Sequence, residues 1–383
     1  MRIGFDGATL YYGSTCELGG GVEWYSRSLL KKMVSLLKKR DLLLFIPSKT
    51  VLDQLIHDGI VTTETKTIIY GTIPFFSRHL FFPLLAMFHR ASILFCPGGQ
   101  LPLFWLGKSV VTIHDTFIYD HPEWFPPEAQ SSLSVRLTVP RTMRRATRLL
   151  AVSHATETRL HARFSETVSK TCVVYPGCDV ALLQDIALPS TDIILCIGTI
   201  EPRKNYLVVL EAFRLFLEQH PQAAVRTRLV IVGKRGWNAE PVFVFAKQLN
   251  TVWRAVAQED VVTLTGFVTE DEKKEWLLRA ALVLFVSLDE GFGFPLLEAC
   301  SFGKVLVASD TGSLPELGGD AVLYVDPSNA RQLALTIAQC LFLPEAVSHL
   351  KQKVYERSQL FSWNSTVAQT IEALISASTE LKK

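Results

Sequence analysis

Short apolar runs, each bounded by Gly, Pro or Asp, recur along this 383-residue chain with helix-like stretches between them. This alternation is typical of β-α-β units, in which helices cover both faces of a parallel sheet and the strands are apolar on both sides. The runs form two sets of six: Arg2–Phe5, Leu42–Ile46, Ile93–Phe95, Val110–Ile113, Leu149–Val152 and Thr171–Val174, then Ile193–Ile197, Arg228–Val232, Val261–Leu264, Leu282–Val286, Val305–Ala308 and Ala321–Val325. We therefore expect an α/β protein with two doubly wound, Rossmann-like domains and a ligand in the cleft between them.

The length of the chain also favours two domains, because 383 residues exceed what one hydrophobic core usually serves. Pro, Gly and Ser residues gather between Tyr175 and Thr191, where we place the linker. The expected domains are residues 1–185 and 186–360. A final amphipathic helix within residues 361–383 would pack back on the first domain. Its apolar residues at helical spacing are Val367, Ile371, Leu374 and Ile375.

Composition narrows the classes of function. Hydrophobic residues make up 48% of the chain and the net charge is only +2, which favours a globular protein without a nucleic-acid partner. The seven cysteines are scattered, without a CxxC pair or a histidine at ligand spacing, so we expect a reducing compartment and no metal site. No signal peptide and no run of 18 apolar residues is present, which predicts a cytoplasmic protein.

A glycine-rich turn follows the first predicted strand. Gly19, Gly20 and Gly21 precede a helix-like stretch, and the backbone amides of such a turn can approach a phosphate at the positive end of a helix. An ordinary flexible turn explains the same residues. Three consecutive glycines do not match the GxGxxG spacing of a nicotinamide binder, which disfavours a dehydrogenase.

A histidine directly follows a strand of the first set. His114 and Asp115 come after Val110–Ile113, at the carboxyl edge of the predicted sheet, where ligands bind in open α/β folds. His114 is therefore a candidate to hydrogen-bond a sugar hydroxyl. The alternative is a structural histidine whose hydrogen bonds are satisfied by a neighbour.

A pair of cations opens the second domain. Arg203 and Lys204 follow Gly198 in the turn between a strand and the predicted helix Tyr206–Gln219. Arg provides a bidentate fork and Lys a point charge, so together they can clamp a diphosphate at a helix N-terminus. The alternative is a solvated surface pair.

Two carboxylates eight positions apart form the most specific pattern. Glu290 lies in a loop after Leu282–Val286, and Glu298 lies one turn into the following helix. Carboxylates accept hydrogen bonds from paired sugar hydroxyls, so both are candidates to bind one ligand. Helix capping by Glu290 is the alternative. The loop between them, which we also expect at the ligand, contains Gly291, Phe292, Gly293 and Phe294.

A small-residue turn, Ser309 to Glu316, ends the next strand of the second set. Its hydroxyl groups and amides are candidates to hold phosphates or a base. A plain turn accounts for the residues equally well.

Taken in order, these motifs resemble the retaining glycosyltransferases once called group 1 and now family 4, which have the GT-B fold. The strings that carry the resemblance are GTIEPRKN, LVIVGKRGW, LTGFV, LFVSLDEGFGFPLLEAC and SDTGSLPELGGDAVLYVDP in the second domain. The first domain matches more loosely, through GGGVEWYSRSL, VTIHD, LLAVSHAT and VVYPGCD.

The resemblance implies a role for each matching residue. Arg203 and Lys204 would neutralise the leaving diphosphate, Glu298 would bind the ribose hydroxyls, and Glu290 would hold hydroxyls of the transferred sugar. His114 would contact that sugar, and the Gly20 region would lie near the diphosphate or the acceptor. It implies a metal-independent hexosyltransferase that uses a GDP- or UDP-linked sugar as donor and a glycan or lipid-linked saccharide as acceptor, and mannose is the sugar we consider.

Two other functions are compatible with these motifs, and a membrane contact is a further possibility that the sequence raises. A nucleotide-sugar epimerase can share the architecture, and a non-catalytic nucleotide-sugar sensor can share the site. The aromatic stretch Phe75 to Arg90 is edged by cations. It fits a buried helix bent at Pro83, or a surface that rests on a bilayer and gives the protein peripheral membrane contact.

Overall fold

The computed structural model describes residues 1–10, 20–38, 41–73, 75–178 and 192–380. The chain divides into two compact units, each with its own parallel sheet: unit 1 contains residues 1–177 and 361–383, and unit 2 contains residues 178–360. The predicted boundary at residue 185 lies outside the described residues.

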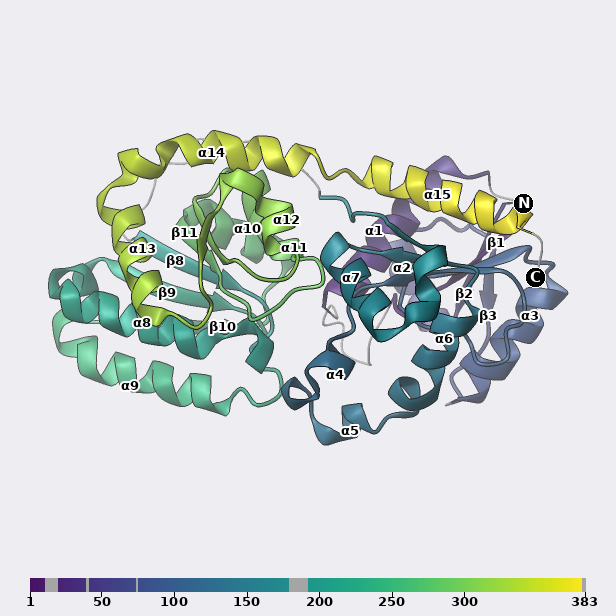
Figure 1. Ribbon diagram of the computed structural model, residues 1–383, viewed down its shortest axis with the longest axis horizontal. Coiled ribbons are helices and arrows are strands. Elements are labelled where there is room, and N and C mark those ends of the chain that lie inside the picture. Colours follow the sequence, from purple (N-terminus) through teal and green to yellow (C-terminus); the bar gives the residue numbers. More distant parts are fainter. Residues whose placement is uncertain (11–19, 39–40, 74, 179–191, 381–383) are drawn as a thin grey trace. The chain divides into compact units, whose positions relative to one another are not determined.

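Unit 1 is built on a seven-stranded parallel sheet in the order β3-β2-β1-β4-β5-β6-β7 (Figure 1). Its strands are β1 (Ile3–Asp6), β2 (Leu42–Ile46), β3 (Thr67–Ile69), β4 (Ile93–Cys96), β5 (Ser109–Ile113), β6 (Arg148–Ala151) and β7 (Thr171–Val173). Its helices are α1 (Gly21–Leu36), α2 (Lys49–His57), α3 (Phe82–Phe88), α4 (Phe117–Asp120), α5 (Pro127–Gln130), α6 (Val139–Arg145), α7 (His154–Arg163) and α15 (Trp363–Thr379), with single π-helical turns at η1 (Ser77–Phe81) and η3 (Ser134–Thr138). The strand order reverses between β1 and β4.

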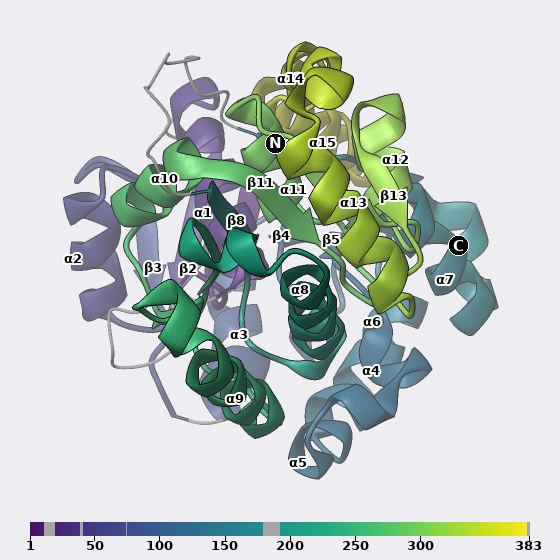
Figure 2. The ribbon, with the colours of Figure 1, turned by 90° about the vertical axis from the view of Figure 1, so that its left-hand side faces the viewer.

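Unit 2 has a six-stranded parallel sheet in the order β10-β9-β8-β11-β12-β13. The strands are β8 (Asp192–Ile197), β9 (Thr227–Val232), β10 (Val262–Gly266), β11 (Ala280–Phe285), β12 (Leu306–Ser309) and β13 (Leu323–Val325). The helices are α8 (Tyr206–Gln219), α9 (Glu240–Ala257), α10 (Glu270–Arg279), α11 (Phe294–Ser301), α12 (Leu314–Gly318), α13 (Ala330–Phe342) and α14 (Pro344–Gln359). Figure 2 shows α8, α9 and α13 together on one face of this sheet, where their apolar residues form one core cluster with the strands.

All twelve predicted strands are present, which confirms the α/β architecture with two parallel sheets. Among the strands of the described residues, the sequence prediction missed β3, a three-residue edge strand with one buried side chain, Ile68. An edge strand with one buried residue lacks the continuous apolar run by which the other strands were found.

The last helix, α15, belongs to unit 1 and packs against α1 and strands β4 to β6. Val367 and Leu374 are fully buried, as their spacing predicts, but Ile375 is 52% exposed. Trp363 begins the helix against Gly177, where an added Cβ would lie 2.2 Å from the Trp363 backbone nitrogen. The absence of a side chain at Gly177 therefore allows the chain to pass this close to α15.

No single helix among the described residues is long and apolar enough to cross a membrane, although the bent pair 330–342 and 344–379 meets the length and composition criteria together. Leu333 and Ile337 of α13 lie in the core cluster of unit 2, which accounts for the apolar character of that helix.

Candidate functional site

The strand order of unit 2 fixes where a ligand site can form. It reverses between β8 and β11, and loops that follow neighbouring strands on the two sides of such a switch point diverge and leave a crevice at the carboxyl edge. Arg203 and Lys204 lie in the loop after β8, and Glu290 lies in the loop after β11. The predicted basic pair and the first predicted carboxylate therefore meet at this position.

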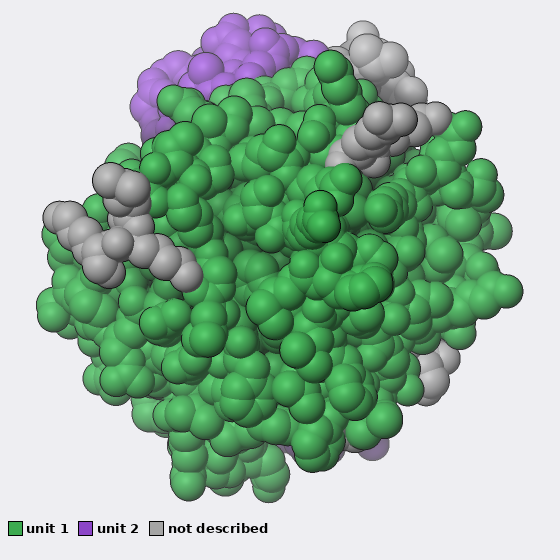
Figure 3. Space-filling model, turned by 90° about the vertical axis from the view of Figure 1, so that its right-hand side faces the viewer, with its two compact units in different colours: residues 1–177, 361–383 green, residues 178–360 purple. Residues whose placement is uncertain are grey.

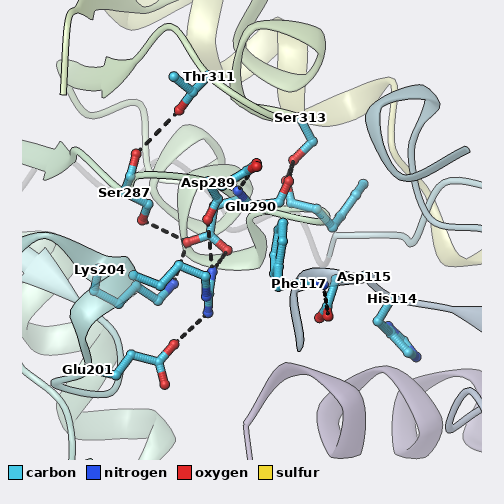
Figure 4. Close-up of polar contacts among 12 residues, drawn as sticks. His114, Asp115, Phe117, Glu201, Lys204, Ser287, Asp289, Glu290, Thr311 and Ser313 are labelled. Atoms are coloured by element: carbon cyan, nitrogen blue, oxygen red, sulfur yellow. Dashed lines mark hydrogen bonds and ion pairs between the residues drawn. The ribbon is translucent and has the colours of Figure 1, made fainter. Parts of the chain in front are cut away.

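Glu290 is held at both carboxylate oxygens. Lys204 Nζ donates to Oε1 at 2.6 Å, and Arg203 donates to Oε2 at 2.5 Å. Ser287 Oγ donates to Oε1 at 2.7 Å, and Figure 4 shows the carboxylate facing both Lys204 and Ser287. Arg203 also pairs with Glu201, at 2.7 Å. Glu290 and Lys204 are buried, whereas the side chain of Arg203 is 18% exposed. The Glu290 carboxylate thus binds these three side chains and does not cap a helix, which was its alternative role.

The local backbone explains why the two cations point inward. Pro202–Lys204 form a 3-10 turn that ends at Asn205, whose φ of 59° is left-handed. Asn205 Nδ2 donates to the carbonyl oxygens of Val286 and Pro327, and Leu288 N donates to Arg203 O at 2.8 Å. The cations thus precede α8 and belong to a turn fastened to the Glu290 loop. This is the position between strand and helix that the sequence predicts.

Charge compensation dominates the electrostatics of this cluster. Burial acts to raise the pKa of Glu290, but the charges of Arg203 and Lys204 outweigh it and lower the pKa to about 2. Glu290 is therefore ionised at any physiological pH. A carboxylate can accept about four hydrogen bonds and three come from the residues described here, so a further donor from a ligand can be accommodated.

The turn after β12 supports the Glu290 loop. Ser313 Oγ donates to the carbonyl oxygens of Phe292 and Glu290, at 2.7 and 3.1 Å, and Ser309 Oγ donates to Ser287 O at 2.5 Å. The hydroxyl groups of Ser309 and Ser313, which were candidates to bind phosphates, therefore donate to backbone carbonyl oxygens. An added Cβ at Gly312 would lie 2.2 Å from Asp289 Oδ1, so the turn and the loop are in direct contact.

The predicted glycine and phenylalanine residues shape the start of α11. Gly293 has a φ of 101°, which a residue with a side chain rarely adopts, and it precedes the first residue of the helix. Phe292 is buried and its ring packs edge-on against Phe294 at 4.9 Å between centroids. Gly291 is buried in the same loop. Phe292 therefore contributes to the packing of this loop, and its contact with a ligand stays a prediction.

Glu298 belongs to a second ion-paired group. It lies on α11 and accepts from Lys273 Nζ of α10 at 2.9 Å, and Lys273 also pairs with Glu270 at 2.9 Å. Glu298 and Lys273 are 17% and 15% exposed. Lys273 was not predicted as a site residue, because no local sequence pattern indicates a lysine that pairs with a residue 25 positions away.

His114 lies in unit 1, directly after β5. Its Nε2 is 2.7 Å from the carbonyl oxygen of Pro97, and its ring meets that of Tyr25 edge-on at 4.9 Å between centroids. Burial lowers its pKa to about 4, and the hydrogen bond to Pro97 offsets this only in part. Because a carbonyl oxygen can only accept, Nε2 carries the proton and Nδ1 of the neutral ring is an acceptor. Asp115, its neighbour in sequence, accepts from Phe117 N instead, as Figure 4 shows.

Gly20 and Gly21 lie at the start of α1, and Gly19 lies outside the described residues. An added Cβ at Gly20 would meet nothing within 4 Å, so crowding does not require glycine there. The first turn of α1 also contains a buried carboxylate, Glu23, 3.6 Å from Arg27. This negative charge is unfavourable for an anion at the same helix end, and the phosphate role of Gly20 and Gly21 stays a prediction.

Metal-ligating side chains are dispersed across the described part of the chain, where no group of three His, Cys, Asp or Glu residues could hold an ion. The six cysteines that the structure describes are free, and Cys16 lies outside this part.

Residues 184–357 match the family model described as glycosyl transferases group 1. The matched segment contains the Arg203–Lys204–Glu290 cluster and the Lys273–Glu298 pair. Unit 2 thus carries a group 1 glycosyltransferase domain, and the chain has the GT-B fold.

Curated relatives of the chain include mannosyltransferases, and solved structures share its fold. The chain is 27% identical over 282 residues to the O-antigen chain mannosyltransferase B of Escherichia coli, a match that covers 70% of each protein. It is 29% identical over 196 residues to the serotype-specific mannosyltransferase WbdA of Escherichia coli, which covers 50% of this chain but only 22% of that protein. The crystal structure of Anabaena HepE in complex with UDP-glucose superposes with a TM-score of 0.72 at 19% identity, over 98% of this chain and all of that one, and it supports the fold alone.

Proposed function

We propose that this protein transfers mannose from a nucleotide-diphosphate sugar to a glycan or lipid-linked saccharide, with retention of anomeric configuration and without a metal ion. The observation that carries the proposal is the ion-paired cluster of Arg203, Lys204 and Glu290 at the switch point of unit 2. Mannose is proposed because curated relatives from Escherichia coli and Salmonella are named as mannosyltransferases.

Negative charge develops on the diphosphate as the bond to the anomeric carbon breaks. Arg203 and Lys204 are fixed by Glu290 before a ligand arrives, so they can stabilise that charge without reorganising. The cost of holding two cations together is offset by the ionised Glu290, whose pKa is about 2. Two preorganised cations supply the charge stabilisation for which many transferases use a divalent metal.

The remaining roles follow from donor and acceptor chemistry. Neutral His114 can accept a hydrogen bond from a sugar hydroxyl at Nδ1, because its Nε2 proton is engaged by Pro97. Glu290 can accept one further hydroxyl, and Glu298, oriented by Lys273, can accept the two hydroxyls of a ribose. Neither His114 nor Glu290 is proposed as a covalent nucleophile. The acceptor would attack on the face that the leaving diphosphate vacates, and that diphosphate would take its proton.

A donor panel with product analysis tests the proposal. Purified protein is incubated with GDP-mannose and with other GDP- and UDP-linked sugars, and both binding and slow donor hydrolysis are measured. We expect GDP-mannose to be hydrolysed slowly without acceptor and to give an α-linked product with one. An isomerised sugar nucleotide would identify an epimerase, and binding without turnover would identify a sensor.

The metal-free step has its own test. Activity measured after dialysis against EDTA is expected to equal that of the untreated protein. Loss of activity that Mg²⁺ restores would overturn this part of the proposal.

A reducing, cytoplasmic location, which we also propose, is supported by the six free cysteines.

A further inference from the structure

The helical segment before β4 and Phe104 in the loop after β4 present apolar side chains to solvent. We call this surface the aromatic face, and its members are Phe75, Phe76, Phe81, Leu84, Phe88 and Phe104. Five of the seven exposed phenylalanines among the described residues belong to it, and Phe88 is 80% exposed. Scattered exposed apolar residues need no explanation, but a contiguous group of large ones marks an interaction surface.

The aromatic face is one surface built by two segments. On α3, Phe82, Pro83 and Ala86 are buried against the core, whereas Leu84, Met87 and Phe88 are exposed. The Phe75 ring contacts the Phe104 ring edge-on, with 6.5 Å between centroids. This arrangement combines the two sequence-based alternatives, because one side of the segment is a buried helix and the other is an exposed surface.

Positive charge surrounds the aromatic face. The chain has no Asp or Glu between residues 65 and 114 or between residues 129 and 156, while these two segments contain nine Lys and Arg residues. Arg78 is neutralised by the buried Asp6, at 3.0 Å, and Arg148 is paired with Glu380. The exposed cations of these segments include Arg90, two residues after the end of α3, Arg136 on η3, and Arg144 and Arg145 on α6.

Direct contacts join the cationic elements to the aromatic face. Arg141 Nε of α6 donates to Leu103 O at 2.8 Å, next to Phe104. Gln100, in the same loop, donates to Ser134 of η3. The elements η3 and α6, which carry Arg136, Arg144 and Arg145, therefore contact the loop that contains Phe104. Figure 3 is viewed from the side on which Figure 1 places α3, and unit 1 presents there a broad, rounded face.

We infer that this side of unit 1 docks on a lipid bilayer that contains anionic headgroups. Aromatic side chains insert at the boundary between headgroups and acyl chains, and Arg side chains around them contact anionic headgroups. A second copy of the chain fits less well, because a symmetric contact through the aromatic face would bring two cationic rims together. If the proposed transfer function holds, this docking presents the enzyme to lipid-linked acceptors.

Vesicle cosedimentation tests the inference without using enzyme activity. The wild-type protein is mixed with vesicles of phosphatidylglycerol and phosphatidylethanolamine, or with vesicles of phosphatidylcholine alone. We expect binding to the anionic vesicles, weakened by added salt, and at least tenfold weaker partitioning to phosphatidylcholine.

Two double variants separate the apolar and the charged contributions. Phe76→Ser/Phe88→Ser and Arg144→Glu/Arg145→Glu should each lower partitioning to anionic vesicles at least tenfold, with unchanged thermal unfolding because the four side chains are exposed. The matched control is Val244→Ser/Val252→Ser on α9, whose side chains are 46% and 70% exposed and which should bind like the wild type.

Three results would overturn the inference: no binding of the wild type to anionic vesicles, wild-type binding by both double variants, or an equal loss in the α9 control. Concentration-dependent dimerisation that Phe76→Ser/Phe88→Ser abolishes, without vesicle binding, would assign the aromatic face to a second copy instead. Failure of donor turnover would leave the vesicle result unaffected.

Discussion

Lys273 Nζ lies 2.9 Å from Glu298 Oε1 and 2.9 Å from Glu270 Oε2, so one lysine of α10 links a carboxylate of its own helix to one on α11. Burial acts to lower the pKa of Lys273, but Glu298 and Glu270 outweigh it and raise the pKa. The lysine is therefore positively charged and fixes the rotamer of Glu298. A carboxylate held in this way is preoriented toward the ribose hydroxyls that we propose it binds.

Lys273→Met is expected to weaken nucleotide binding about tenfold while changing kcat little, because Lys273 orients Glu298 and does not touch the reacting atoms. Calorimetry with GDP and with its 2′-deoxy analogue measures the effect. The wild type should favour GDP, and the variant should lose most of that preference. An equal loss of affinity for both nucleotides would contradict the positioning role, and Lys274→Met, on the exposed side of α10, is the matched control.

Glu290→Gln is expected to lower kcat at least tenfold, a loss of about 1.4 kcal/mol or more of transition-state stabilisation. Gln keeps the volume of the side chain but leaves Arg203 and Lys204 without a counter-charge, so these cations lose their fixed positions. Breaking one side of a buried ion pair also costs about 3 to 5 kcal/mol of folding stability. Turnover and thermal unfolding are measured together.

A matched change at Glu201 distinguishes the two effects. Glu201→Gln removes the second carboxylate that pairs with Arg203 but leaves the contacts of Arg203 and Lys204 with Glu290 in place. Its turnover should stay within about threefold of the wild type, a difference of under about 1 kcal/mol. Equal losses in both variants would mean that Glu290 acts only by neutralising Arg203.

The fold was predictable because its signal is local and repeated. Each parallel strand is buried on both faces and is read as an uninterrupted apolar run, and helix α8 was predicted from Tyr206 to Gln219 with the bounds that the structure has. Local patterns also placed Arg203, Lys204 and Glu290 in loops that follow β8 and β11. The sequence does not show which loops are adjacent, since that depends on the order of strands in the sheet.

The details that were missed depend on long-range contacts. The proton position on His114 is set by the carbonyl of Pro97, 17 residues away, and no side-chain pattern encodes it. Ser313 resembles a ligand-binding serine in sequence, yet its hydroxyl group is used on the loop that holds Glu290. In both cases the hydrogen-bond partner is a backbone carbonyl, which every residue possesses and which no motif can reveal.

The partly buried His114 should make folding stability depend on pH. Its pKa is lowered from 6.5 to about 4 in the folded protein, so the unfolded chain binds more protons between these values. The stability that neutral His114 contributes is complete above pH 6.5 and is lost as the pH falls toward 4, by up to about 3 kcal/mol. Chemical denaturation of wild type and His114→Gln across this range measures the difference.

Glu290 gives a pH dependence in a separate range. Its pKa is lowered from 4.5 to about 2, so its contribution is present above pH 4.5 and is lost as the pH falls toward 2. The slope between pH 6.5 and 4.5 should therefore be smaller in His114→Gln and unchanged in Glu290→Gln. Identical slopes in wild type and His114→Gln would mean that His114 is not held neutral by burial.

The contact between Gly312 and the Glu290 loop gives the last prediction. Gly312→Ala should destabilise unit 2 by about 2 kcal/mol or more and lower kcat, because the φ of 60° is unfavourable for alanine and the new Cβ would lie 2.2 Å from Asp289 Oδ1. Gly266→Ala is the matched control, since Gly266 has a similar φ of 75° but open space around the added carbon. It should lose only about 1 kcal/mol and keep its kcat. If both variants lose activity equally, backbone strain alone explains the effect, and the turn after β12 does not position Glu290.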